Sequence, residues 1–184
     1  MSKTKSVSEI TGAMLLHNFY AEDLRGGFLK VLQRSRLPEP LQSLDFCEGF
    51  ISTSRKNVIR GMHFQTPPCD LDKLVTVVTG AVLDVVLDMR KESPTFRKVF
   101  SVKLGADEEF RSLFIPKGCA HGFLALEDNS MMLYQTTCEF HPEHDTGIAY
   151  DSIGFDWNIR KEDIIISEKD RNLPPWDPEE SPFK

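Results

Sequence analysis

Hydrophobic runs long enough to cross a membrane are missing from this sequence. No apolar run approaches the ~20 residues that a transmembrane helix needs. The amino-terminal stretch MSKTKSVSEITGAMLL has lysines, but its apolar part is short, is broken by Gly12 and lacks a clear cleavage site. No signal peptide is predicted from it. We therefore expect a cytoplasmic protein with no membrane partner.

Cysteine is scarce and scattered. No Cys-x-x-Cys pair occurs among the four cysteines, which are Cys47, Cys69, Cys119 and Cys138. Two disulfides would suit a secreted chain of this size. Because no signal peptide is predicted, we interpret all four cysteines as reduced thiols.

Positive charge is also in deficit. The net charge is -6, and no basic stripe alternates with aromatic residues. Nucleic acid is therefore a poor candidate partner. A small anionic ligand stays open, because a few well-placed arginines can hold a phosphate whatever the global charge.

The residues that are present have the composition of a soluble globular chain with many short strands. The 184 residues are 40% hydrophobic and 27% charged. Helix signals are weak, apart from a turn near 106–109 and another near 166–171. Gly, Pro, Asp and Asn separate short β-type runs, which indicates an all-β sandwich or barrel. These runs are AMLLHNF, GGFLKVL, NVIRGMHF, KLVTVV, AVLDVVLDM, KVFSVKL, SLFIPKG, HGFLALE and MMLYQTT.

The length fits one domain that buries a sizeable core. We expect a single domain over 1–184, with its core at about 12–171. The segment at about 172–184 is rich in proline and acidic residues. It is expected to wrap the surface or to fray.

The clearest hairpin prediction joins 73–78 to 81–88 through a turn at Thr79-Gly80. Lys73 and Asp84 then lie diagonally across the hairpin, within reach of each other. A buried lysine needs such a partner, because an unpaired ammonium is costly to desolvate. The opposite face is also apolar, so an outward face with an ordinary surface ion pair is the alternative. The face expected inside the barrel carries Lys73, Val75, Val77, Val82, Asp84 and Val86.

The run NVIRGMHFQ carries two side chains that a plain core strand does not need, Arg60 and His63. A regular strand would place these two residues on opposite faces. If both reach one ligand, Gly61 should mark a bulge or kink between them.

A second informative run is FIPKGCAHGFLAL. Its spacing Pro116-x-Gly118-x-x-His121 resembles the second motif of cupins, which are small double-stranded β-barrels. The resemblance implies that the turn delivers His121 onto the next strand, facing the barrel. Metal-binding cupins add a His-x-His pair and a glutamate from their first motif, whereas this chain has only His63 there. Two ligands without a clustered carboxylate make a poor site, so no metal is expected.

An ordered set of motifs spans roughly residues 14–171. The set comprises Arg25-Gly26 with Phe28, NVIRGMHFQ, DKLVTVVTGAVLDVVLDMRKESPTF, FIPKGCAHGF, MMLYQTT, the IGFDW run and Ser167–Asp170. It resembles the dTDP-4-dehydrorhamnose 3,5-epimerase family of metal-free cupin enzymes. The resemblance implies a double-stranded β-helix (a cupin or jelly-roll barrel) with short C-terminal helical segments. It also implies inversion of C3, C5 or both in a nucleotide-linked 4-keto-6-deoxy sugar, within deoxysugar biosynthesis for surface polysaccharide.

Such a reaction needs a base, an acid on the opposite face and a group that holds the enolate oxygen. The C4 carbonyl supplies the acidity at C3 and C5, so no cofactor or metal is needed. By the resemblance, His63 is the base, Asp170 fixes its tautomer, and Tyr134 returns a proton. Lys73, kept charged by Asp84, would stabilise the enolate.

The resemblance also assigns substrate contacts and a partner. Arg60 would hold the diphosphate, because its planar fork suits phosphate oxygens, and Arg25 would help it. His121 would line the sugar site. A homodimer with exchanged N-terminal strands is implied, in which Phe28 reaches the partner's nucleotide pocket. The remaining substrate contacts implied are Phe140, Asp145 and Lys169.

Several positions at the nucleotide end depart from the family pattern. Lys30 stands where an acidic residue is usual, and Glu48-Gly49-Phe50 replaces a Gln-Asp-Asn run. Glu139-Phe140 replaces a tyrosine pair, and Asp145 corresponds to the usual glutamate after it. The proton-transfer residues are unchanged. A GDP-linked 6-deoxy-heptose therefore stays an alternative to a dTDP sugar.

Two other functions stay open at this point. A cupin 3,4-ketoisomerase would move the carbonyl of a 4-keto nucleotide sugar, but Tyr134 together with Asp170 argues against it. A non-catalytic cupin would only bind a sugar nucleotide. That function would not explain why the chain has an acid, a base and a carboxylate paired with the base. The histidines outside the motifs are interpreted as surface residues; they are His17, His141 and His144.

Overall fold

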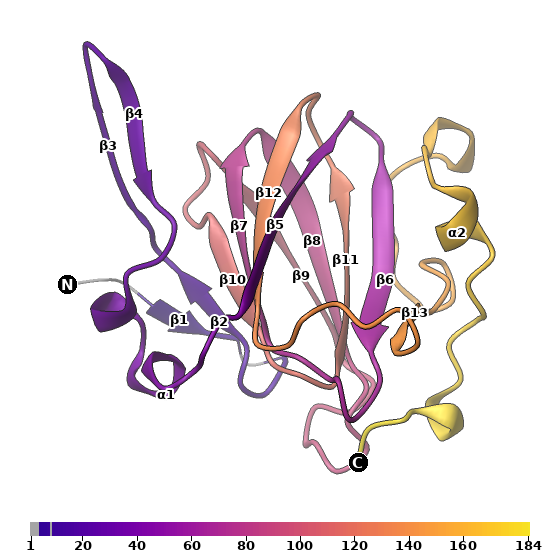
Figure 1. Cartoon of the computed structure of the whole chain (residues 1–184). Coiled ribbons are helices and arrows are strands. Elements are labelled where there is room, and N and C mark those ends of the chain that lie inside the picture. The colour runs from indigo at the N-terminus through magenta and orange to yellow at the C-terminus, as the bar shows by residue number, and fades with distance from the viewer. Residues whose placement is uncertain (1–3, 8) are drawn as a thin grey trace.

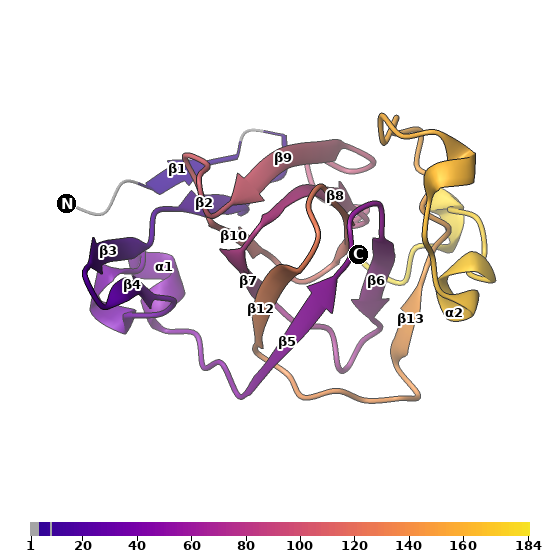
Figure 2. The same cartoon turned by 90° about the horizontal axis from the view of Figure 1, so that it is seen from above.

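Two antiparallel sheets face each other and form a barrel (Figure 1), and the view from above shows their strands around a common centre (Figure 2). The computed structural model describes residues 4–7 and 9–184. The first sheet has the order β1 (Thr4–Ser6), β2 (Met14–Leu16), β10 (Ser112–Ile115), β7 (Lys73–Thr79), β12 (Ser130–Thr136) and β5 (Glu48–Ser54). The second has the order β13 (Asp145–Gly147), β6 (Ile59–Gln65), β11 (Cys119–Ala125), β8 (Ala81–Asp88) and β9 (Val99–Gly105).

Helices are short and lie outside the barrel. An early pair consists of a 3-10 turn at Arg34–Arg36 and α1 (Glu39–Gln42). Later ones are a 3-10 turn at Lys161–Asp163, α2 (Glu168–Arg171) and a 3-10 turn at Pro178–Glu180. In the described part of the chain, none of them has the length and apolar character of a membrane span. The predicted fold class, an all-β double-stranded β-helix with short C-terminal helical segments, is confirmed.

The predicted hairpin between β7 and β8 is wrong. β7 pairs with β10 and β12 in the first sheet, whereas β8 pairs with β11 and β9 in the second. The Thr79-Gly80 turn therefore carries the chain from one sheet to the other. The turn signal says only that the chain reverses, and both strands are apolar on both faces, so each finds neighbours in its own sheet.

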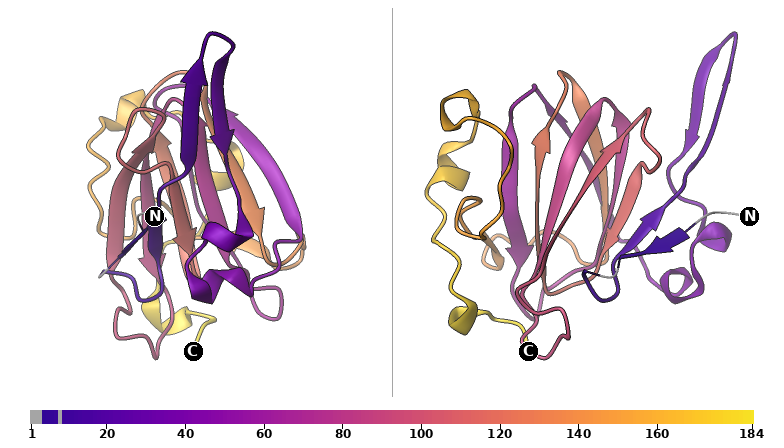
Figure 3. Two further views of the ribbon diagram at one scale, coloured as in Figure 1. Left: turned by 90° about the vertical axis from the view of Figure 1, so that its left-hand side faces the viewer. Right: turned by 180° about the vertical axis from the view of Figure 1, so that it is seen from behind.

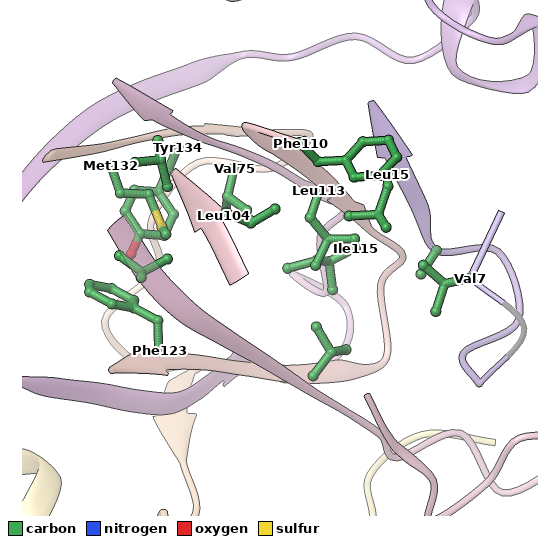
Figure 4. Packing of buried hydrophobic residues seen from close by; sticks show 14 of the residues in the cluster. Val7, Leu15, Val75, Leu104, Phe110, Leu113, Ile115, Phe123, Met132 and Tyr134 are labelled. Carbon is green, nitrogen blue, oxygen red and sulfur yellow. The ribbon is translucent and has the colours of Figure 1, made fainter. Parts of the chain in front are cut away.

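The face predicted to point inward does so. Val75, Val77, Val82 and Val86 are buried in the cluster between the sheets, together with Leu113, Phe123 and Met132. Figure 4 shows Tyr134 beside Met132 and Phe123 at one end of this cluster, with Leu15 and Val7 at the other. The inner cluster thus fills one part of the barrel with apolar packing and brings a phenol to its edge.

Two peripheral segments cover the outer faces of the sheets. The C-terminal region packs on the second sheet, where Trp157 and Phe183 are buried against it, and it runs down the side of β6 in Figure 3. The ring of Phe183 lies 5.6 Å from that of Phe64. Leu41 of α1 covers the first sheet against Leu74 and Phe114. The tail therefore wraps the surface and does not fray.

A long hairpin projects away from the barrel (Figures 1 and 3). Its strands are β3 (Phe19–Asp23) and β4 (Gly26–Lys30), which pair with each other in a two-stranded sheet. Most of its apolar side chains are exposed, with Phe28 at 56% and Leu24 at 107% of their reference areas. The hairpin therefore presents an apolar surface that this chain does not bury.

Candidate active site

A cavity of about 170 Å³ opens between the two sheets. Its walls come from β5, β7 and β12 on one side and from β6 and β11 on the other. The side chains that line it are Glu48, Phe50, Ser52, Arg60, His63, Phe64, Gln65, Leu71, Lys73, His121, Phe123, Tyr134, Thr136, Phe140 and Asp145.

A bulge in β6 brings Arg60 and His63 to the same cavity. Arg60 pairs with Phe123 and His63 pairs with His121, so β6 uses one residue more than β11 over this stretch. Gly61 lies at the bulge with φ +120, a conformation that side chains disfavour. The predicted irregularity at Gly61 is confirmed, and it explains how residues three apart in a strand line one cavity.

His63 is held by a buried carboxylate. Its Nε2 lies 2.8 Å from Oδ1 of Asp170, and Asp170 is 5% exposed. The amide of Gly61 donates to the other carboxylate oxygen at 3.2 Å. Burial acts to raise the pKa of Asp170, but the hydrogen bonds from His63 and Gly61 lower it overall. Asp170 stays ionised and fixes the orientation of the imidazole.

Tyr134 approaches the cavity from the opposite sheet. It stacks on Phe50, with ring centroids 4.7 Å apart and planes 11° from parallel. The His121 ring lies edge-on at 6.1 Å. Burial raises the pKa of the Tyr134 phenol well above its ordinary value. The group is therefore a neutral proton donor throughout the physiological range.

Lys73 has a different partner from the one predicted. Its ammonium donates to the backbone carbonyl of His63 at 3.0 Å, whereas Asp84 bonds Nε2 of His121 at 2.9 Å. The direct Lys73–Asp84 pair is thus wrong, because the two strands lie in different sheets. Burial lowers the pKa of Lys73 to about 8, against the attraction of Asp145 first and of Asp84 less strongly.

The His121–Asp84 pair lies in the barrel wall. Asp84 is fully buried and His121 is 4% exposed. A carboxylate this deep needs a hydrogen-bonded partner, because burying an unpaired charge costs several kcal/mol. The pair fixes the His121 ring where it lines the cavity.

Other predicted contacts lie at the cavity rim. Arg60 is exposed, and its guanidinium donates to Ser54 Oγ at 3.0 Å and to the Thr53 carbonyl at 3.1 Å. The Phe140 ring is 56% exposed at the mouth. Lys169 does not line the cavity, but its ammonium lies 2.6 Å from Asp145, which does.

Arg25 and Phe28 lie on the projecting hairpin and do not line the cavity of their own chain. Arg25 forms an exposed ion pair with Asp23 at 2.6 Å. Phe28 contacts Phe19 edge-on, with ring centroids 6.4 Å apart. In one chain, the structure therefore separates these two predicted residues from the rest.

Glu48 and Phe50 of β5 were noted only as departures from the family pattern, and Ser52 of the same strand was not singled out. Glu48, Phe50 and Ser52 alternate along this strand and line the cavity. Glu48 also accepts a hydrogen bond from the Phe140 amide at 2.7 Å. Glu48 and Gly49 are residue types depleted in strands, and 48–54 was not among the predicted strands. Gln65 and Thr136 were likewise not singled out.

Fold and site together define a β-barrel enzyme of the cupin type, with ionisable groups converging from both sheets. The chain belongs to the dTDP-4-dehydrorhamnose 3,5-epimerase family, which it matches over residues 7–177. It is 40% identical over 171 residues to a dTDP-4-dehydrorhamnose 3,5-epimerase of Methanothermobacter thermautotrophicus, covering 91% of each chain. It is also 40% identical over 169 residues to that of Escherichia coli, covering 90% of each.

Solved structures agree with this assignment. A dTDP-4-dehydrorhamnose 3,5-epimerase from Bacillus anthracis, with TDP and PPi bound, superposes with a TM-score of 0.86 at 34% identity, covering 96% of this chain and 100% of that one. A dTDP-6-deoxy-D-glucose-3,5-epimerase from Legionella pneumophila, in complex with dTDP-4-keto-L-rhamnose, gives 0.85 at 30% identity, with the same coverage.

The expected family and enzyme class are confirmed by these matches. The chain is an isomerase, a nucleotide-sugar epimerase. The matches support this function and not the ketoisomerase or the non-catalytic binding protein.

Proposed function

We propose that this epimerase inverts C3 and C5 of a dTDP-linked 4-keto-6-deoxy sugar through an enolate. The observation that carries the proposal is the approach of His63 and Tyr134 to one cavity from opposed sheets. The ligands of the relatives, TDP in one structure and dTDP-4-keto-L-rhamnose in another, favour dTDP over a GDP-linked heptose.

His63 acts as the base. Its Nε2 bonds Asp170, so Nδ1 is the nitrogen left to take a proton from carbon. As the imidazole becomes imidazolium, the ionised Asp170 stabilises the new charge. The His63 side chain is 32% exposed and lines the cavity, which gives a substrate access to it.

Tyr134 acts as the acid on the other face. Because its phenol stays protonated, it can deliver a proton to the carbanion from the side opposite His63. Removal of the proton on one face and its return on the other inverts the configuration of the carbon. The same pair serves a second carbon once the sugar ring is repositioned.

Lys73 holds the enolate oxygen. Lys73 lines the cavity, and its ammonium donates to the His63 carbonyl. A buried cation at the place where negative charge develops stabilises the transition state more than the ground state. The nearby carboxylates of Asp145 and Asp84 keep part of its positive charge in place.

The rim of the cavity binds the nucleotide. Arg60 is exposed there with a planar fork that suits a diphosphate. Phe140 offers a stacking surface for the base, and Lys169 and Asp145 flank it. His121 lines the sugar end.

The projecting hairpin completes the site of a second copy. In this proposal the chain is a cytoplasmic homodimer, and Phe28 and Arg25 of one chain reach the nucleotide end of the other. The exposed apolar residues of the hairpin support an intermolecular role.

The test of the base is His63→Asn. Solvent deuterium exchange at C3 and C5 of dTDP-4-keto-6-deoxyglucose is followed by NMR, and TDP binding is followed by calorimetry. We expect exchange to fall by roughly 10²–10⁴-fold while TDP binding persists, because only the proton acceptor is lost. Equal exchange in both proteins would remove His63 from its role.

A further inference from the structure

A cluster of two thiols and an imidazole is formed by residues close in the sequence to Leu71 and Phe140, which line the cavity. Cys69 belongs to the β6–β7 loop, and Cys138 and His141 follow β12. A ligand atom from each of the three lies within 4.8 Å of the other two, and all three residues are half-buried. The fold thus joins cysteines that are far apart in the sequence, and it places a histidine interpreted as a surface residue beside them.

One buried side chain holds the three segments in place. Gln65 is 5% exposed, and its Nε2 donates to the carbonyls of Cys69 at 2.9 Å and of Glu139 at 3.1 Å. Its Oε1 accepts from the His141 amide at 2.7 Å. The amide of Cys69 also bonds the Thr66 carbonyl at 3.0 Å. The backbone around all three ligands is therefore fixed before anything binds.

We propose that Cys69, Cys138 and His141 bind one Zn²⁺ ion, with a water molecule in the fourth position. Two thiolates and an imidazole are the ligands that zinc prefers among divalent cations in proteins. In a tetrahedral site these atoms stand about 3.5–3.8 Å apart, as follows from zinc–ligand bonds of 2.0–2.3 Å. The three ligand atoms now lie within 4.8 Å of one another, and small side-chain rotations would bring them to these distances.

The ion would act as a structural clamp. It would tie the segment after β12 to the β6–β7 loop at the mouth of the cavity. Phe140 lies between two of the ligands in the sequence and lines that cavity. Zinc binding therefore stiffens the part of the rim that carries this ring. The ion is separate from the proton-transfer residues, and the site stands whether or not the proposed function does.

The experiment measures zinc in the reduced, full-length protein. Protein is stripped with a chelator and titrated with Zn²⁺ by calorimetry and with Co²⁺ by visible absorption. We expect one ion per chain and the spectrum of tetrahedral cobalt with thiolate ligands. Cys69→Ser, Cys138→Ser and His141→Gln should each abolish stoichiometric binding. Cys47→Ser is the matched control, since Cys47 lies outside the cluster, and it should bind as wild type does.

A thermal melt supplies the second readout. Zn²⁺ should raise the melting temperature of wild type and Cys47→Ser, because it binds only the folded state. The three ligand variants should melt cooperatively but without a zinc-dependent shift. The proposal is overturned if folded Cys138→Ser takes up as much zinc as wild type, or if wild type takes up none.

Discussion

At the scale of single residues, Lys73 is a group of the cavity whose charge changes at mildly basic pH. Burial lowers its pKa to about 8, so the ammonium that holds the enolate is lost as pH rises through that value. We predict that kcat/KM falls on the basic side near pH 8. Tyr134 does not contribute this limb, since burial raises the pKa of its phenol further from neutrality. A pH–rate profile measures the effect.

Lys73→Met is the matched variant for this prediction. It should lower kcat by roughly 10²–10³-fold and remove the basic limb. Because the folded pKa lies below the unfolded one, the wild type should gain stability as pH rises from about 8 towards about 10.5, and the variant should not. If the pH–rate profile of Lys73→Met still falls on the basic side near pH 8, a group other than Lys73 causes that fall.

Single residues were the part of the site that the sequence indicated best. His63, Lys73, His121 and Tyr134 were expected at one cavity, and the structure brings them to it. The partner of Lys73 was misassigned, because a diagonal contact was inferred from a strand pairing that does not form. Partners across a barrel depend on which sheet each strand joins, and alternation along one strand does not carry that information.

At the scale of elements, the bulge in β6 decides whether two functional groups share a cavity. A Cβ added at Gly61 would lie 2.5 Å from the Gly122 Cα and 2.7 Å from the His121 carbonyl oxygen. We predict that Gly61→Ala lowers the free energy of unfolding by about 1–3 kcal/mol or more and lowers kcat. Chemical denaturation and steady-state kinetics measure the two effects.

Gly154→Ala is the control for backbone strain alone. Gly154 also has positive φ, but an added Cβ meets nothing within 4 Å. It should cost less stability than Gly61→Ala and leave kcat unchanged. Equal effects of the two substitutions would mean that close packing at the bulge is unimportant.

Some features of the strands and turns could be predicted from the sequence and others could not. The Gly61 irregularity could be predicted, because Arg60 and His63 stand an odd number of residues apart. β5 could not, because a polar strand with glycine resembles a loop until β12 pairs with it. The β7–β8 turn was recognised, but whether the chain returns beside its own strand or crosses to the facing sheet depends on the whole barrel.

At the scale of the whole molecule, the projecting hairpin predicts shared sites. If Phe28 serves the partner's cavity, two inactive chains should complement each other. Co-expressed His63→Asn and Phe28→Ala chains form mixed dimers in which one cavity has an intact His63 and receives an intact Phe28. We predict more activity from these purified mixed dimers than from either variant alone.

The control for complementation is a chain that carries both substitutions. Mixed with Phe28→Ala, it supplies no intact hairpin and should restore nothing. Activity of the His63→Asn and Phe28→Ala mixture no higher than that of its parents, with dimers shown by light scattering, would place each hairpin at its own cavity. The dimer was predicted from the family resemblance. The sequence itself showed only the apolar run GGFLKVL, which would be a poor free edge in a monomer.

The most direct test of the opposed acid and base is Tyr134→Phe in deuterium oxide, read by NMR with dTDP-4-keto-6-deoxyglucose. Loss of the phenol should leave His63 able to remove and return a proton on its own face. We predict that deuterium still enters the sugar with its original stereochemistry, while inverted product falls by roughly 10²–10⁴-fold. Inverted product at the wild-type rate would contradict the account.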